Sequence, residues 1–152
     1  YGKTRYVFSE ESLMKYISYG SNLNLEQMRF RCPNAKPLGK MLLPNFSLVF
    51  RGVADIEEKN GLVCPVGVWD ITKKCEQALD RYEGYPHLYS KIFFKLDDEL
   101  AMTYVMNTNR VQPPSQSYFQ SIEEGYDNFG LDKKYLFEAR ANAYKESNFT
   151  LL

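Results

Sequence analysis

The sequence contains few of the residues that build metal and thiol chemistry. Its 152 residues include one histidine, His87, which removes most histidine-based metal sites, His-Glu-x-x-His among them. Cys32, Cys64 and Cys75 are odd in number and lack the paired spacing of a metal site. We therefore expect no metal site, and we interpret the cysteines as free thiols in a reducing cytoplasm. A cysteine nucleophile paired with His87 is disfavoured, since no cysteine lies in a recognisable nucleophile motif.

The sequence also lacks net charge and long apolar runs. Acidic and basic side chains number 19 each, so the chain has no basic footprint of the kind that binds nucleic acid. No apolar stretch is long enough to span a membrane, and no signal-peptide pattern or glycine-rich phosphate loop is present. We expect a cytoplasmic protein without a nucleic-acid or membrane partner, either a monomer or a homodimer.

The length and the even composition predict one domain. A chain of this size buries a sizeable core, and no internal repeat or low-complexity segment divides it. Residues 14–152 are predicted to form the domain. Because the chain starts at Tyr1 without Met, residues 1–13 are predicted to be an N-terminal extension or a remnant of processing.

Strands are predicted in the centre of the chain. Asn60-Gly61 is a strong hairpin signal and closes a predicted charged turn over residues 55–60. A second turn is predicted at the acidic run 97–99. The predicted strands cover residues 14–19, 37–43, 45–53, 62–71, 89–96 and 101–107.

Helices are predicted over residues 24–30, 72–82, 115–129 and 132–144. In the clearest one, 72–82, Cys75, Ala78, Leu79 and Tyr82 form one apolar stripe, and Gly84 has the position of a C-terminal stop. Strands in the centre and helices at the C-terminal end indicate the α+β class. We expect a mostly antiparallel curved sheet or small β-barrel, flanked by helices.

The tetrapeptide Tyr19-Gly20-Ser21-Asn22 lies between an apolar run and a predicted helix. Glycine tolerates a positive φ, so the chain can turn sharply at Gly20, and serine and asparagine often cap helices. Backbone amides at such a turn have no helical partner and can bind an oxygen anion. A loop of this composition is more often only a loop, so its meaning depends on the other motifs.

Glu83 is the strongest candidate for an acid or base. It comes directly after the predicted helix stripe and before Gly84. The C-terminus of a helix disfavours negative charge, and Tyr82, Tyr85 and Tyr89 would desolvate the carboxylate. Both effects raise its pKa, which suits a base at neutral pH. Composition alone favours an exposed glutamate in a turn, and His87 is interpreted as a surface or satisfied loop histidine.

Three separated segments resemble the γ-glutamylcyclotransferase family. Tyr19-Gly20-Ser21-Asn22-Leu23 resembles its substrate loop, and Leu79-Asp80-x-x-Glu83-Gly84 resembles the segment that carries its catalytic glutamate. Tyr104-Val105-Met106-Asn107 with Pro113-Pro114-Ser115-x-x-Tyr118 resembles a third block. Two shorter segments, Arg31-Cys32-Pro33-x-Ala35 and Gly67-Val68-Trp69, are also similar to the family. The resemblance spans residues 16–140 and implies a γ-glutamylcyclotransferase-like fold.

The resemblance implies a reaction without a cofactor on a small-molecule γ-glutamyl substrate. The α-amino group of a γ-glutamyl amide attacks its own γ-carbonyl, giving 5-oxoproline and a free amine. By this resemblance, Glu83 is the general acid/base. The loop of Tyr19, Gly20, Ser21, Asn22 and Leu23 binds substrate oxygens through backbone amides, and Tyr104 and Tyr118 are pocket walls and hydroxyl donors.

A non-catalytic small-molecule or protein binding module on the same scaffold is the alternative. The family includes members that act on other γ-glutamyl or aminoacyl groups and members without established activity, and the core motifs do not separate them. The intact Glu83 argues against a dead enzyme. We expect the leaving-group side of the pocket to be formed by residues 53–61, 85–88 and 108–117.

Overall fold

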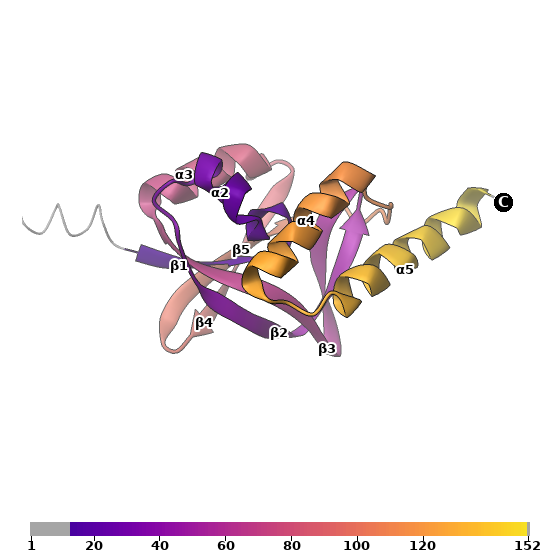
Figure 1. Ribbon diagram of the computed structural model, residues 1–152, viewed down its shortest axis with the longest axis horizontal. Helices are drawn as coiled ribbons and strands as arrows, with labels where there is room; N and C mark the ends of the chain where they lie inside the picture. The colour runs from indigo at the N-terminus through magenta and orange to yellow at the C-terminus, as the bar shows by residue number, and fades with distance from the viewer. Residues whose placement is uncertain (1–12, 152) are drawn as a thin grey trace, which may run out of the picture.

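Five strands form one open sheet in the computed structural model, which describes the backbone of residues 13–151 and the side chains of residues 13–147. The strand order is β2-β3-β1-β5-β4, and every neighbouring pair is antiparallel except β1 and β5 (Figure 1). The α+β class is confirmed, with an open sheet rather than a closed barrel. The strands are β1 (Leu13–Ser18), β2 (Lys36–Arg51), β3 (Val53–Thr72), β4 (Tyr89–Leu96) and β5 (Glu99–Met106).

The expected N-terminal extension lies outside the described residues, apart from Leu13, which begins β1.

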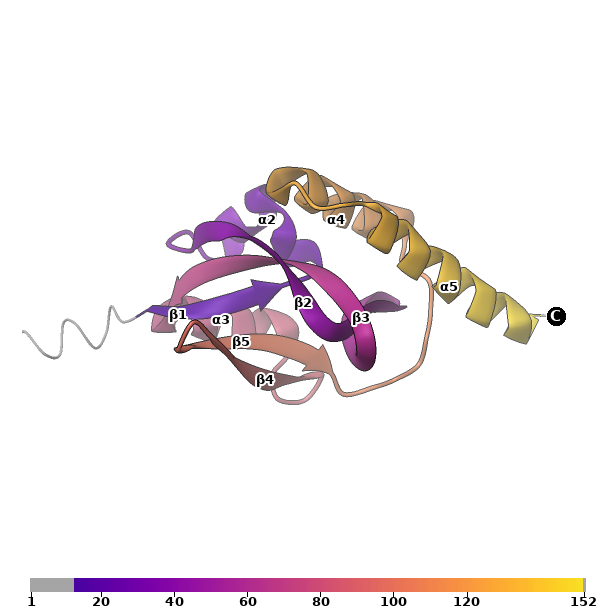
Figure 2. The same ribbon diagram turned by 90° about the horizontal axis from the view of Figure 1, so that it is seen from below.

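The β2–β3 hairpin corrects the sequence-based assignment. The turn predicted at Asn60-Gly61 was wrong, because the chain reverses at Gly52, where φ is 80°. Asn60-Gly61 lies inside β3, at a bulge opposite Asn45. Gly61 has a φ of 87° there, and its amide donates a hydrogen bond to Oδ1 of Asn45 at 3.0 Å. The residues that favour a tight turn therefore form a bulge, and the charged segment 55–60 is strand (Figure 2).

The helices begin at residues that cap them. Asn24 accepts hydrogen bonds from two amides at the start of α2, Thr72 caps α3, and Ser115 caps α4. The last helix, predicted over 132–144, runs further, because no glycine or proline follows Gly130. The helical elements are η1 (Ser21–Leu23), α2 (Leu25–Arg31), α3 (Lys73–Glu83), α4 (Gln116–Phe129) and α5 (Lys134–Leu151). Among the described residues, none of them is long and apolar enough to cross a membrane.

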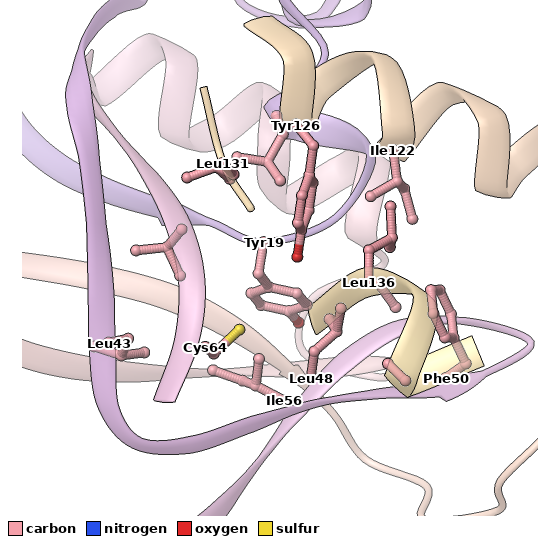
Figure 3. Close-up of a cluster of buried hydrophobic side chains, with 14 of the residues drawn as sticks. Tyr19, Leu43, Leu48, Phe50, Ile56, Cys64, Ile122, Tyr126, Leu131 and Leu136 are labelled. Atoms are coloured by element: carbon pink, nitrogen blue, oxygen red, sulfur yellow. The ribbon is translucent and has the colours of Figure 1, made fainter. Parts of the chain in front are cut away.

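Strand β1 separates two hydrophobic clusters. Successive strand residues point to opposite faces of a sheet, and accordingly Ile17 belongs to the larger cluster and Tyr16 to the smaller one. The smaller cluster packs β1 against α2 and α3. The larger cluster packs the sheet against α4 and α5, and Figure 3 shows Tyr19 in it, near Tyr126. The chain that leaves β1 at Tyr19 therefore emerges between two packed layers.

Helix α4 packs closely against the segment that follows β1. A Cβ added at Gly125 would lie 2.6 Å from Cβ of Leu23 and 2.8 Å from the backbone nitrogen of Asn24, so only glycine fits there. The Asn24 side-chain amide also donates to the Ser121 carbonyl at 2.9 Å. This close approach brings Tyr118, on the first turn of α4, to residues 20–24.

Candidate active site

A cavity of about 570 Å³ lies where η1, the end of α3 and the start of α4 meet. The predicted site residues come from four separate parts of the chain, and the fold brings all of them except Leu23 to its wall: Tyr19, Gly20, Ser21, Asn22, Glu83, Tyr104 and Tyr118. No cluster of His, Cys, Asp or Glu side chains in residues 13–147 is arranged to hold a metal ion.

Glu83 is the last residue of α3 and is partly buried in the cavity wall. Gly84 takes the left-handed conformation after it, with a φ of 71°, so the helix ends there. Burial raises the pKa of Glu83 to about 7, and the nearby Arg31 guanidinium opposes this rise. The expected rise in pKa is thus confirmed. Within the described residues the carboxyl group makes no hydrogen bond or ion pair, so it is available to a cationic ligand.

Limited space, and not a positive φ, favours glycine at position 20. Its φ is −120°, so the positive φ suggested by the sequence is wrong. A Cβ on Gly20 would lie 3.1 Å from Cβ of Ala54 and 3.4 Å from the Tyr118 hydroxyl. The loop thus passes so near β3 and α4 that a side chain at this position would be crowded.

The amides of the loop differ in their availability. The Leu23 amide donates to the Gly20 carbonyl at 3.0 Å, and the Leu23 side chain is fully buried, so Leu23 does not face the cavity. The amides of Ser21 and Asn22, by contrast, have no acceptor among the described residues. These two groups, at the start of η1, are free to bind an anion from the cavity.

The Tyr104 and Tyr19 hydroxyls are already engaged inside the protein. Tyr104 donates to Oδ1 of Asp80 at 2.6 Å, and Tyr19 donates to the Tyr104 carbonyl at 2.6 Å. Tyr104 therefore contributes its ring to the wall, and the expectation that it donates its hydroxyl to the pocket does not match this geometry.

The Tyr118 hydroxyl is oriented differently. It accepts a hydrogen bond from the Ala54 amide at 2.9 Å, and its own hydrogen has no acceptor among the described residues. Of the three tyrosines that the sequence predicted for the site, Tyr118 is therefore the one whose hydroxyl can donate to a ligand.

The segments 53–61, 85–88 and 108–117, which we expected on the leaving-group side of the pocket, line the cavity only in part. From the expected segments, Val53, Ala54, His87, Leu88 and Thr108 line it, together with the end of β5. His87, interpreted from the sequence as a surface residue, is exposed and also lines the cavity.

Asp55 was missed by sequence reasoning, which placed it in a charged turn. It lies in β3, 2% exposed, and its Oδ2 accepts a hydrogen bond from Nε of Arg51 at 2.7 Å. Its Oδ1 accepts the Met106 amide at 3.0 Å. Burial raises the pKa of Asp55, while these hydrogen bonds oppose the rise. The pair holds the end of β5, which forms part of the cavity wall. The feature of the sequence that indicates this buried pair is Arg51, which lies four residues before Asp55, on the other side of the turn at Gly52.

Comparisons with known proteins identify the family. A model described as "Gamma-glutamyl cyclotransferase, AIG2-like" matches residues 16–126. The human protein named "Gamma-glutamylcyclotransferase" is 28% identical over 159 residues, covering 93% of this chain and 83% of that protein. Its mouse counterpart is 28% identical over 151 residues, covering 86% and 80%. A solved structure titled "Gamma-glutamyl cyclotransferase" has a TM-score of 0.75 at 26% identity, covering 86% of this chain and 88% of that one. The resemblance seen in the motifs is confirmed, and this chain belongs to the gamma-glutamyl cyclotransferase, AIG2-like family.

Proposed function

We propose that this chain is a γ-glutamylcyclotransferase that converts a γ-glutamyl amide to 5-oxoproline and a free amine, with Glu83 as general acid/base. The observation that carries the proposal is the raised pKa of Glu83, about 7, in a cavity that also holds free backbone amides. The names of the human and mouse relatives support the reaction.

The reaction needs one group that first accepts and then returns a proton. The substrate α-amine is an ammonium at neutral pH, and the Glu83 carboxylate takes one of its protons. The amine lone pair then attacks the γ-carbonyl carbon, a C–N bond closes the five-membered ring, and the original amide C–N bond breaks. Glu83 returns this proton to the nitrogen of the leaving group. The ring nitrogen loses its second proton as it becomes an amide, and this proton passes by way of Glu83 to the departing amine, which is released as an ammonium. Because the nucleophile is part of the substrate, the protein mainly holds the substrate in its cyclising conformation.

The free amides of Ser21 and Asn22 are the proposed anchor for substrate oxygens, either the α-carboxylate or the developing oxyanion. Because Gly20 has no side chain, this loop can pass close to Tyr118, whose hydroxyl is proposed to donate to the same ligand. Tyr19 and Tyr104 form the wall behind it. Leu23 acts indirectly, by packing the loop against α4.

We also propose a cytoplasmic location, which three free and buried cysteines support. The monomeric or homodimeric state stays a prediction, and light scattering on the purified protein tests it.

Turnover of γ-glutamyl-alanine tests the function. We expect the protein to release 5-oxoproline and alanine, both quantified by chromatography, and the Glu83→Gln variant to release them on the order of 10²–10⁴-fold more slowly. The non-catalytic binding module predicts a different result, in which the unaltered protein binds the substrate in calorimetry and forms no 5-oxoproline.

A further inference from the structure

Arg31, the last residue of α2, contacts both sides of the candidate site without lining the cavity. Its Nη1 donates to Oδ1 of Asn22 at 2.6 Å and to Oγ of Ser21 at 3.3 Å. Its guanidinium carbon lies 3.8 Å from the ring centroid of Tyr82, the residue before Glu83. One side chain thus touches the loop that carries the free amides and the helix end that carries the base.

We propose that Arg31 is a positioning residue of this site, which holds the loop of residues 20–23 in a fixed relation to the end of α3. The proposal rests on the proposed function for its kinetic consequence, while the contacts that define it are independent of any reaction.

The guanidinium is itself held in place. Its Nη2 donates to Oε1 of Gln27, one turn earlier on α2, at 2.8 Å. The Arg31 guanidinium therefore donates through Nη2 to α2 and through Nη1 to the loop, and it also packs on the ring of Tyr82. Lysine has one ammonium point charge and no planar face, so it cannot make this set of contacts together.

The contact with Asn22 extends into the cavity wall. The Asn22 side chain accepts from Arg31 and donates through Nδ2 to the Tyr16 hydroxyl at 2.8 Å. Asn22 is 3% exposed, so both ends of its amide are committed inside the protein. Loss of the Arg31 partner would leave Oδ1 of Asn22 buried without a hydrogen bond, which favours rotation of the side chain and movement of the free backbone amide beside it.

Arg31 also acts on the charge of Glu83. Its guanidinium lowers the pKa of Glu83, against the larger effect of burial. The remaining titratable groups of the cavity wall are His87, Tyr82 and five tyrosines whose pKa values burial raises: Tyr16, Tyr19, Tyr89, Tyr104 and Tyr118. The tyrosines that sense the Glu83 charge come from β1, the loop after it, β4 and α4: Tyr16, Tyr19, Tyr89 and Tyr118. Among the described residues, Arg31 is thus the cation that lowers the pKa of Glu83.

The test uses Arg31→Gln with Arg29→Gln as its matched control. Arg29 lies on the same helix, is exposed, and makes no hydrogen bond or ion pair with the described residues, so both variants lose one positive charge from α2. Two readouts are compared in both: kcat/KM for γ-glutamyl-alanine between pH 5.5 and 9, and the pKa of the Glu83 carboxyl by ¹³C NMR.

We expect kcat/KM of Arg31→Gln to fall about 10- to 100-fold, because small displacements of anchoring groups cost rates of that size. In Arg31→Gln, we expect the acidic limb of the kcat/KM profile and the Glu83 pKa measured by NMR to move to higher pH. Arg29→Gln should match the unaltered protein in both readouts. Arg31→Lys should keep the pKa of Glu83 and lose kcat/KM, since it restores the charge and not the planar guanidinium.

Equal behaviour of Arg31→Gln and Arg29→Gln overturns the proposal. If Arg31→Gln does not fold, Arg31→Lys decides, and a normal kcat/KM in that variant overturns the positioning role. If the unaltered protein does not turn over γ-glutamyl-alanine, the proposed function fails separately. The NMR pKa of Glu83 and the Asn22 side-chain amide signals then still test whether Arg31 holds the two sides of the site.

Discussion

The Tyr104 hydroxyl donates to Asp80, which lies one helical turn before Glu83 on α3. Asp80 also pairs with Lys91 of β4, whose Nζ lies 2.9 Å from Oδ1 of Asp80. The two carboxylates of the motif Leu-Asp-x-x-Glu-Gly therefore have separate tasks. Asp80 fixes α3 to the β4–β5 pair and orients the Tyr104 ring, while Glu83 is left without a partner in the cavity wall.

Tyr104 and Tyr118, which both line the cavity, should respond differently to loss of their hydroxyls. In Tyr118→Phe, we expect KM for γ-glutamyl-alanine to rise, because a free donor is lost from the cavity. In Tyr104→Phe, we expect kcat and KM to change little and stability to fall by about 1 kcal/mol, because the lost hydrogen bond is internal. Steady-state kinetics and urea unfolding measure both. A larger kinetic loss in Tyr104→Phe than in Tyr118→Phe would contradict this assignment.

Replacement of Glu83 should remove the chemistry and preserve binding. Glutamine is nearly the same size and cannot take up a proton, so we expect kcat of Glu83→Gln to fall on the order of 10²–10⁴-fold. In the unaltered protein, kcat/KM should rise with pH through about 7, where Glu83 ionises. Stopped assays of 5-oxoproline across pH measure both. A variant with unaltered kcat would show that Glu83 is not the base.

The same variant should be more stable than the unaltered protein at neutral pH. The folded pKa of Glu83, about 7, lies above the ordinary glutamate value of 4.5, so the folded state binds more protons between these pH values. Its stability therefore falls as pH rises from about 4.5 to about 7, and the full penalty remains above that range. We compare the free energy of unfolding of Glu83→Gln with that of the unaltered protein. We expect this difference to favour the variant by on the order of 1–3 kcal/mol more at pH 8 than at pH 4. Thermal unfolding at the two pH values checks this, and a lower Tm of the variant at pH 8 would indicate a structural ion pair instead.

Gly20 should tolerate no branched side chain. Gly20→Val adds a Cβ that lies 3.1 Å from Cβ of Ala54, and the two γ-methyl groups crowd the loop further. We expect KM to rise and kcat to fall together, because the loop moves away from Glu83. The double variant Gly20→Val, Ala54→Gly removes the atom that is met first, and it should recover part of kcat/KM. If Gly20→Val alone turns over substrate normally, the loop is not the anchor.

The buried pair of Arg51 and Asp55 should contribute strongly to stability. Their side chains are 6% and 3% exposed, and Asp55→Ala leaves the arginine without its buried partner. We expect a loss of about 3–5 kcal/mol in urea unfolding. Glu57→Ala is the matched control, because Glu57 lies 3.6 Å from Nη2 of Arg51 with its side chain 44% exposed. That variant should lose at most about 1 kcal/mol, and equal losses in the two would contradict the role of the buried pair.

Local signals in the sequence determined the helices and the position of the candidate base. Helix signals act within a few residues, so the helices predicted to begin at residues 24 and 72 begin one residue later in the structure, and Gly84 ends α3 as predicted. Glu83 could be placed at a helix end from its neighbours along the chain, and the direction of its pKa shift could be predicted, although the burial that raises the pKa comes from the whole cavity wall. The order of the motifs also indicated the family, which the comparison over residues 16–126 confirmed.

The tertiary structure alone decided which polar groups are engaged and where the long hairpin turns. Asn60-Gly61 satisfies the local requirements of a turn and of a bulge equally, and pairing with Asn45 selected the bulge. Asp55 is buried because Arg51 and the end of β5 reach it, and the Tyr104 hydroxyl is unavailable because Asp80 lies opposite. Such partners are distant in sequence, and desolvation and hydrogen bonding depend on them rather than on the local pattern.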